Sequence, residues 1–214
     1  MRILYSKLFS ATLIIYIILP VVLFAQTDDE AYVNKVFISA KGQVNHLSNN
    51  FIKGTSGWVI SLDANYYITE KFSTGIFAGW HTNNEYTDNE TYIYENQTVN
   101  TSMQRSVYQV PLGILGRYDI ADNKTVSPYV QLKIGANYSK QSVYLPIAEL
   151  NNKNWGIYIS PEVGINVYLV KSIKLVLQAS TYYAYASNTF NFMNAHKVTG
   201  LSNLGLRIGL SVPI

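Results

Sequence analysis

The stretch from Trp155 to Leu169 alternates strictly between apolar and polar positions, and this alternation constrains the fold more than any other feature of the chain. Successive side chains of a β-strand point to opposite faces, so the stretch predicts one long strand with an apolar and a polar face. A soluble sandwich turns its apolar face inward and seldom needs so long a strand. A membrane barrel turns the apolar face towards lipid. We call the residues that share one face of a strand, which are alternate residues of the sequence, a parity. The apolar parity of this stretch is Trp155, Ile157, Ile159, Pro161, Val163, Ile165, Val167 and Leu169.

Seven further runs show the same period of two. They cover about 33–46, 56–68, 72–83, 105–120, 125–141, 173–186 and 200–214, and Leu115 is a local break in the pattern. No heptad, helical repeat or convincing amphipathic helix accompanies them. The sequence therefore predicts an all-β fold, an eight-stranded antiparallel up-and-down transmembrane β-barrel over residues 33–214.

The connections between these runs alternate in length, which predicts the direction of the strands. Those after the second, fourth and sixth runs are turns of a few residues, whereas the others are longer and polar. Outer-membrane barrels have short periplasmic turns and long external loops. We therefore expect odd-numbered strands to run outward and even-numbered strands to return. The longest predicted external loop is 84–104.

Aromatic residues of the apolar parity gather at the ends of the predicted strands. Trp and Tyr favour the two interfaces of a membrane, so they predict two girdles. All three tryptophans fall at the external rim, which a general preference of aromatics for strands does not explain. The predicted outer girdle is Trp58, Trp80, Tyr138, Trp155, Tyr183 and Tyr185, and the inner girdle is Tyr66, Phe72 and Tyr118.

The N-terminal residues 1–25 have the features of a cleavable signal peptide. Arg2 and Lys7 precede an apolar run, and Ala25 is a small residue before Gln26. An uncleaved membrane helix is the alternative, since the run is just long enough to span. Residues 26–32 predict a short periplasmic leader. Without Arg2 and Lys7 the formal charge falls from +3 to +1, which gives no reason to expect nucleic acid as a partner.

The chain has no cysteine, and only 14% of its residues are charged, against about 25% in soluble domains. The absence of cysteine excludes disulfides, thiol catalysis and thiolate metal sites. An exported chain without disulfides must be held by its backbone ladder and its packing. A closed barrel provides this because every strand is paired and no edge remains.

Charged residues of the polar parity predict a network inside the barrel. An eight-stranded barrel is only wide enough for its side chains to fill it, so we expect these groups to be packed and paired. A buried charge left without its partner costs about 3–5 kcal/mol. The expected pairs are Lys133 with Glu162, and Lys41 or Arg207 with Asp63. An ion path or a gate is the alternative. The predicted network is Lys41, Asp63, Arg117, Lys133, Glu162 and Arg207.

This arrangement resembles the eight-stranded outer-membrane barrels of the outer membrane protein A-like kind, especially the barrel-only proteins of the Bacteroidetes. The resemblance is one of architecture over about 33–214, together with the Ala25-Gln26 junction. The chain ends on Ile214, where many such barrels end on an aromatic residue. The resemblance implies the cell outer membrane as location. It also implies outer-membrane lipid, lipopolysaccharide and the outer-membrane insertion machinery as partners.

Some barrels of this kind modify lipids with a histidine and a Ser, Asp or Glu near the external rim. His46, His81 and His196 lie at or near that rim, and His81 is predicted to face the lumen beside Glu85 and Asp88. No spacing of His, Asp or Glu indicates a metal site, and no Gly-rich run indicates a phosphate loop. We therefore predict no catalytic residue, no metal and no cofactor.

Three hypotheses for the function follow. The first is a non-catalytic barrel with a structural or surface-interaction role in the cell envelope. Its loop 84–104 is either a solvated, mobile cap or the contact for a surface partner. The second is an outer-leaflet lipid A deacylase or acyltransferase. The third is a soluble lipocalin-like barrel, which the charged residues expected in the lumen disfavour because such a cavity should be apolar.

Overall fold

The computed structural model describes residues 36–48, 52–94, 97–120, 126–144, 149–170, 175–192 and 196–214. The predicted signal peptide (1–25) and leader (26–32) lie outside these residues. None of the described segments forms a helix with the length and apolar character that crossing a bilayer requires.

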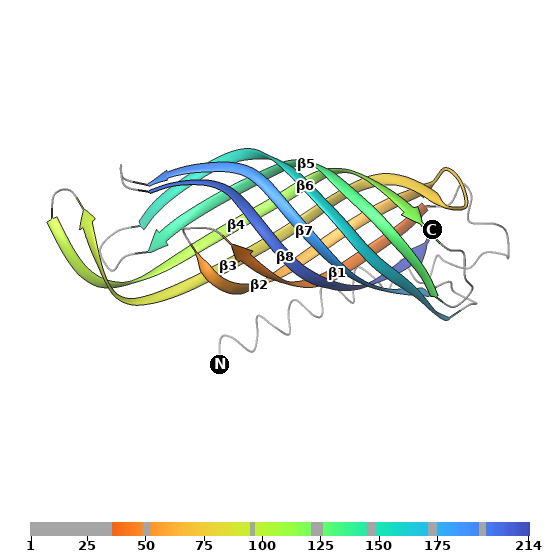
Figure 1. Cartoon of the computed structure of the whole chain (residues 1–214), viewed down its shortest axis with the longest axis horizontal. Helices are drawn as coiled ribbons and strands as arrows, with labels where there is room; N and C mark the ends of the chain where they lie inside the picture. Colours follow the sequence, from red (N-terminus) through yellow and green to blue (C-terminus); the bar gives the residue numbers. More distant parts are fainter. Residues whose placement is uncertain are drawn as a thin grey trace.

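The eight strands form one closed barrel in which each strand pairs antiparallel with the next (Figure 1). The ring closes where β1 pairs with β8, in a register that runs from Phe37–Pro213 to Ser48–Ser202. This confirms the predicted all-β, eight-stranded antiparallel architecture. The strands are β1 (Val36–Ser48), β2 (Lys53–Tyr67), β3 (Phe72–Tyr94), β4 (Gln97–Asp119), β5 (Val126–Tyr144), β6 (Glu149–Val170), β7 (Leu175–Phe192) and β8 (His196–Pro213).

The two parities of each strand face opposite sides of the wall. Ile157 and Leu206 are 62% and 65% exposed on the outside, whereas Glu162 and Arg207 are each 2% exposed inside. A soluble barrel would have the reverse arrangement, because exposed apolar surface on this scale is unfavourable in water. Leu115, the predicted break in the pattern, is an inward-facing residue and is buried.

The strands extend well beyond the predicted external ends, which corrects the prediction of a long loop over 84–104. β3 continues to Tyr94 and β4 begins at Gln97, so most of that segment is a paired β-hairpin. β5, β6, β7 and β8 are longer than predicted in the same direction. Strands predicted to end near the outer interface therefore continue as β-structure beyond it.

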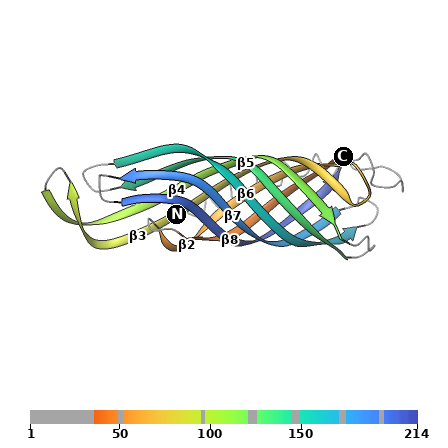
Figure 2. The ribbon, with the colours of Figure 1, turned by 45° about the horizontal axis from the view of Figure 1, so that its top comes forward.

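The β3–β4 hairpin projects further than any other part of the described chain, at the end opposite the C-terminus (Figure 1 and Figure 2). The pairing of β2 with β3 ends at Trp58–Thr82, and the pairing of β4 with β5 begins at Gln104–Tyr144. Beyond these points, within the described residues, β3 and β4 pair only with each other. The hairpin is thus a two-stranded ribbon that stands on the barrel.

The described members of the two predicted girdles lie on the outer wall, towards the two ends of the barrel. Trp80, Trp155, Tyr183 and Tyr185 are exposed on the outer wall, and Tyr138 packs against Trp155 with a centroid distance of 5.3 Å. At the opposite end Tyr66, Phe72 and Tyr118 are also exposed on the outer wall. The side chain of Trp58 lies outside the described part of the structure.

The natural absence of cysteine makes the orientation testable by labelling. Tyr86 is 67% exposed on the β3–β4 hairpin, and Lys71 is exposed in the turn between β2 and β3 at the other end. We expect Tyr86→Cys to react with a membrane-impermeant maleimide on intact cells. Lys71→Cys is the matched control and should react only after the outer membrane is permeabilised. The opposite pattern of labelling would show that the predicted orientation is wrong.

Candidate functional site

The lumen is the candidate functional site, because five charged side chains from five different strands meet there. Lys41 (β1), Asp63 (β2), Lys133 (β5), Glu162 (β6) and Arg207 (β8) are each 1–2% exposed. Each belongs to the inward parity of its strand, which is why strands far apart in sequence deliver charges to the same space. The group holds three cations and two carboxylates and has a net charge of +1.

Asp63 is held from two sides. Its Oδ1 accepts a hydrogen bond from Nζ of Lys133 at 2.6 Å, and its Oδ2 lies 3.0 Å from Nζ of Lys41. Ser61 Oγ donates to Oδ1 at 3.1 Å, and Gln131 Nε2 donates to Oδ2 at 3.3 Å. These contacts replace the water that a buried carboxylate has lost.

Glu162 is the second anion of the cluster. Its Oε1 accepts hydrogen bonds from Lys41 Nζ at 2.9 Å, Tyr129 OH at 2.8 Å and Ser180 Oγ at 2.9 Å. Its Oε2 forms an ion pair with the guanidinium of Arg207. Lys41 therefore bridges the two carboxylates, and the cluster is one connected network.

The pairing of these charges differs in part from the prediction. The expected contact of Lys41 with Asp63 is present, whereas the expected pair of Lys133 with Glu162 is wrong. Lys133 binds Asp63, and Arg207 binds Glu162. The reason is geometric: parity determines that a side chain faces the lumen, whereas its partner depends on strand tilt and stagger around the barrel.

Arg207 and Lys133 also lie over aromatic rings of the inner wall. The guanidinium carbon of Arg207 is 3.6 Å from the centroid of Tyr182, and Nζ of Lys133 is 5.2 Å from that of Phe77. Cations favour the faces of aromatic rings, most strongly where water is excluded. Rings and charges together fill the middle of the lumen.

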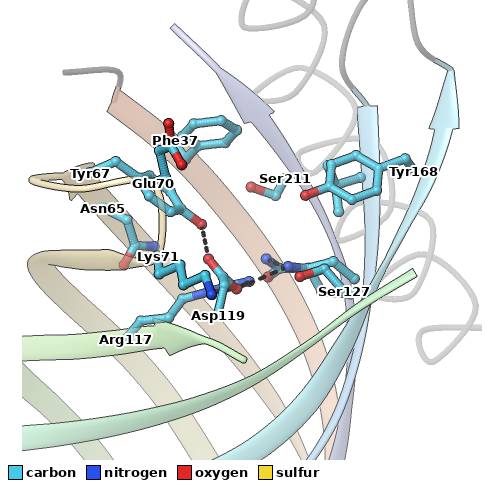
Figure 3. Close-up of a pocket in the computed structure, with 13 residues that line it drawn as sticks. Phe37, Asn65, Tyr67, Glu70, Lys71, Arg117, Asp119, Ser127, Tyr168 and Ser211 are labelled. Carbon is cyan, nitrogen blue, oxygen red and sulfur yellow. Dashed lines mark hydrogen bonds and ion pairs between the residues drawn. The ribbon is translucent and has the colours of Figure 1, made fainter. Parts of the chain in front are cut away.

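Arg117, the sixth predicted member, lies apart from this cluster, at the periplasmic mouth. Its guanidinium forms an ion pair with Asp119 at 2.8 Å, and Tyr67 OH donates a hydrogen bond to Asp119 at 2.6 Å (Figure 3). These side chains line a small pocket of about 30 Å³, which has room for water. Sequence analysis did not identify Asp119 as a member of the network.

Tyr129 joins the mouth to the central cluster. Its ring centroid is 3.8 Å from the guanidinium carbon of Arg117 and 5.7 Å from Nζ of Lys41. Its hydroxyl group donates to Glu162. Polar contacts thus run from the periplasmic mouth to the middle of the barrel with the side chains packed against one another.

The external half of the lumen changes from charged to neutral and then to apolar. Asn137 Nδ2 donates to Gln109 Oε1 at 3.2 Å and to Asn188 Oδ1 at 2.8 Å. Beyond these amides lies an apolar core that sequence analysis did not predict. The signal for it is the same period of two, continued past the outer girdle. The residues of this external apolar core are Leu47, Ile52, Met103, Val107, Val143, Phe190 and Leu201.

The histidines do not form a catalytic arrangement in the described residues. His81 faces the lumen as predicted and is 1% exposed, with its Nε2 3.3 Å from Nε2 of Gln43. Among the described residues no Ser, Asp or Glu forms a hydrogen bond with His81, and its Nδ1 has no hydrogen-bond partner. His46 is exposed on β1, and the side chain of His196 lies outside the described residues. Nor do any three His, Asp or Glu side chains of the described segments group to suit a metal ion.

A family model described as the outer membrane protein beta-barrel domain matches residues 17–211. The chain belongs to this family. It is therefore a protein of the outer membrane of Gram-negative cells, as expected from the lipid-facing apolar side of its strands. Comparison with curated protein sequences gave no significant match.

Solved structures of other outer-membrane proteins share this fold. Neisserial surface protein A (NspA) is similar with a TM-score of 0.57 and 17% sequence identity, over 83% of this chain and 96% of that chain. The outer membrane protein OprG from Pseudomonas aeruginosa is similar with a TM-score of 0.50 and 15% identity, over 86% and 99% of the two chains. At such identities the similarity supports the barrel fold alone.

Removal of one carboxylate charge tests the central cluster. Glu162→Gln keeps the size of the side chain but leaves Lys41 and Arg207 without that counter-charge, so we expect a loss of about 3–5 kcal/mol in the free energy of unfolding. Glu149→Gln is the matched control: its ion pair with Lys140 is long, at 3.6 Å, and partly exposed. We expect that control to change stability by less than about 1 kcal/mol. Urea unfolding in detergent micelles measures the free energy of unfolding of both variants. An equal loss of stability in the two variants would contradict a buried network.

Proposed function

We propose that this protein is a closed, non-catalytic barrel with a structural and surface-contact role in the outer membrane. The observation that supports this most is the occupation of the lumen. Charged, aromatic, amide and apolar side chains succeed one another from the periplasmic mouth to the external end. An open pore of eight strands would need these side chains to be small or absent from the axis.

The network is also unsuited to ion flow for an energetic reason. A permeating cation would have to displace Lys41 or Lys133 from Asp63, and a permeating anion would have to displace Glu162 from Arg207. Breaking one buried pair costs about 3–5 kcal/mol, and several pairs lie in series. The external apolar core adds a second barrier, because it offers a hydrated ion no polar partner.

A lipid-modifying role has less support. His81 is buried inside the lumen, on the side of the wall away from lipid, and no nucleophile or acid is recorded in contact with it in the described residues. A general base must lie within hydrogen-bond reach of the group it activates. The nearby acids Glu85 and Asp88 lie further out, on the β3–β4 hairpin.

The projecting hairpin supports the surface-contact part of the proposal. It carries Glu85, Asp88 and Glu90 against Arg105, so its net charge over the described residues is −2. Arg105 lies 4.0 Å from Glu85 across the two strands. A projecting two-stranded ribbon with an excess of negative charge suits contact with a basic segment of another protein.

The lack of conduction can be measured in planar bilayers. We expect the purified, folded protein to give no discrete conductance steps. The proposal would be contradicted by steps whose ion selectivity changes in Glu162→Gln but not in the exposed control Glu149→Gln. That pattern would place the current inside the lumen.

The lack of catalysis can be measured on the lipid itself. We expect the mass spectrum of lipid A to be the same in cells that express the protein, cells that lack it, and cells that express His81→Ala. A lipid species that appears with the protein and disappears with His81→Ala would instead support the enzyme.

A further inference from the structure

Two lysines lie directly opposite each other on the outer wall of the barrel. Lys140 on β5 pairs with Lys153 on β6, and both share the outward parity of Tyr138 and Trp155, the next outward-facing pair towards the membrane. Directly opposed residues of antiparallel strands have Cβ atoms about 4.5–5.5 Å apart, so like charges at such positions destabilise the sheet. A ligand with negative charge would offset the repulsion between these two ammonium groups.

The protein itself neutralises the pair only in part. Lys140 Nζ lies 3.6 Å from a carboxylate oxygen of Glu149, and both side chains are partly exposed, at 31% and 45%. Lys153 is exposed and forms no ion pair with a carboxylate of the described segments. The two lysines and Glu149 therefore leave one positive charge in excess on this part of the wall.

The depth of the pair in the membrane follows from the rings below it. Four aromatic rings form a row on the outer wall, in the order Trp155, Tyr138, Tyr108 and Trp80. The distances between successive ring centroids are 5.3, 6.4 and 5.4 Å. Such rows mark the membrane interface. Lys153 is two residues beyond Trp155, which is about 6–7 Å along a strand. This places the ammonium groups at the level of the lipid headgroups.

We propose that Lys140 and Lys153 together bind a phosphate group of a lipid in the outer leaflet. A phosphate between them would accept charge-assisted hydrogen bonds from both ammonium groups and remove their repulsion. The acyl chains of the same lipid would lie against the apolar wall below, where Ile134 and Ile157 are exposed.

The strands on the β4 side of the site add no charge at this position. Tyr108 on β4 pairs with Lys140, Thr82 on β3 pairs with Tyr108, and both are uncharged. The proposal goes beyond the closed-barrel function and does not depend on whether the lumen conducts. The experiment below measures lipid binding alone. Its result can therefore contradict the lipid-phosphate site without contradicting the closed barrel, and the conductance measurement can do the reverse.

The test uses the full chain folded in detergent micelles, with bound lipid measured by native mass spectrometry. The probes are diphosphorylated lipid A, the same lipid without its phosphates, and inorganic phosphate. We expect the protein to bind the phosphorylated lipid about tenfold more tightly than the dephosphorylated one. The variant with Lys140→Gln and Lys153→Gln should lose this preference. Lys71→Gln, an exposed lysine at the other end of the barrel, should retain it.

A second variant separates a binding site from a purely structural effect. Lys153→Glu replaces the repulsion with an attraction to Lys140, so the urea midpoint in lipid-free micelles should rise while the preference for phosphorylated lipid disappears. Because this variant is expected to be more stable than the native protein, poor folding of the double variant would not prevent the test.

Three results would overturn the proposal. The first is equal binding of phosphorylated and dephosphorylated lipid by the native protein. The second is an unchanged preference in both lysine variants. The third is binding of inorganic phosphate as tight as that of the phosphorylated lipid, which would show that a lipid is not the specific source of the phosphate.

Discussion

The requirement that every backbone polar group in hydrocarbon find a partner within the protein determines the rest of this structure. Lipid offers no hydrogen bonds, so an open sheet edge inside the bilayer would leave a row of unpaired groups at a cost of several kcal/mol each. The pairing of β1 with β8 removes both edges. Closure then separates two environments, and the period of two assigns each residue to one of them.

The lumen and the outer wall solve opposite problems. On the outside, residues such as Ile76 and Leu206 face lipid. Contact with fluid acyl chains requires an apolar surface but no specific fit between side chains. Inside, a narrow space holds charges that water cannot reach, so each must find partners among its neighbours. The central cluster meets this need with two carboxylates that hold three cations. The same network that stabilises the barrel blocks its axis.

The strand pattern was readable from the sequence only where the two faces meet different media. Between the girdles, lipid on one side and a polar lumen on the other produce strict alternation, as from Trp155 to Leu169. Beyond Thr82 most residues on both faces of β3 are polar, so the alternation that separates strand from loop is weak there. The hairpin over 84–104 was therefore predicted as a loop although it is β-structure.

The charged residues of the lumen were predictable by position but not by partner. Parity assigns Lys133 and Glu162 to the interior, yet Lys133 meets Asp63 on β2 across the barrel. That contact depends on how far the strands are staggered, which no local pattern reports. The external apolar core was missed for a related reason, since Met103 and Val143 belong to segments that were not recognised as continuous strands.

Pairing gives the β3–β4 ribbon a reach that a loop of equal length would not have. Twelve residues of β3 follow Thr82, and as a strand they extend about 40 Å, whereas a flexible chain of that length spans about 19 Å on average. The tip is thus carried to roughly twice the height above the membrane. In the predicted orientation, a molecule that approaches the cell meets this ribbon before it meets the wall of the barrel.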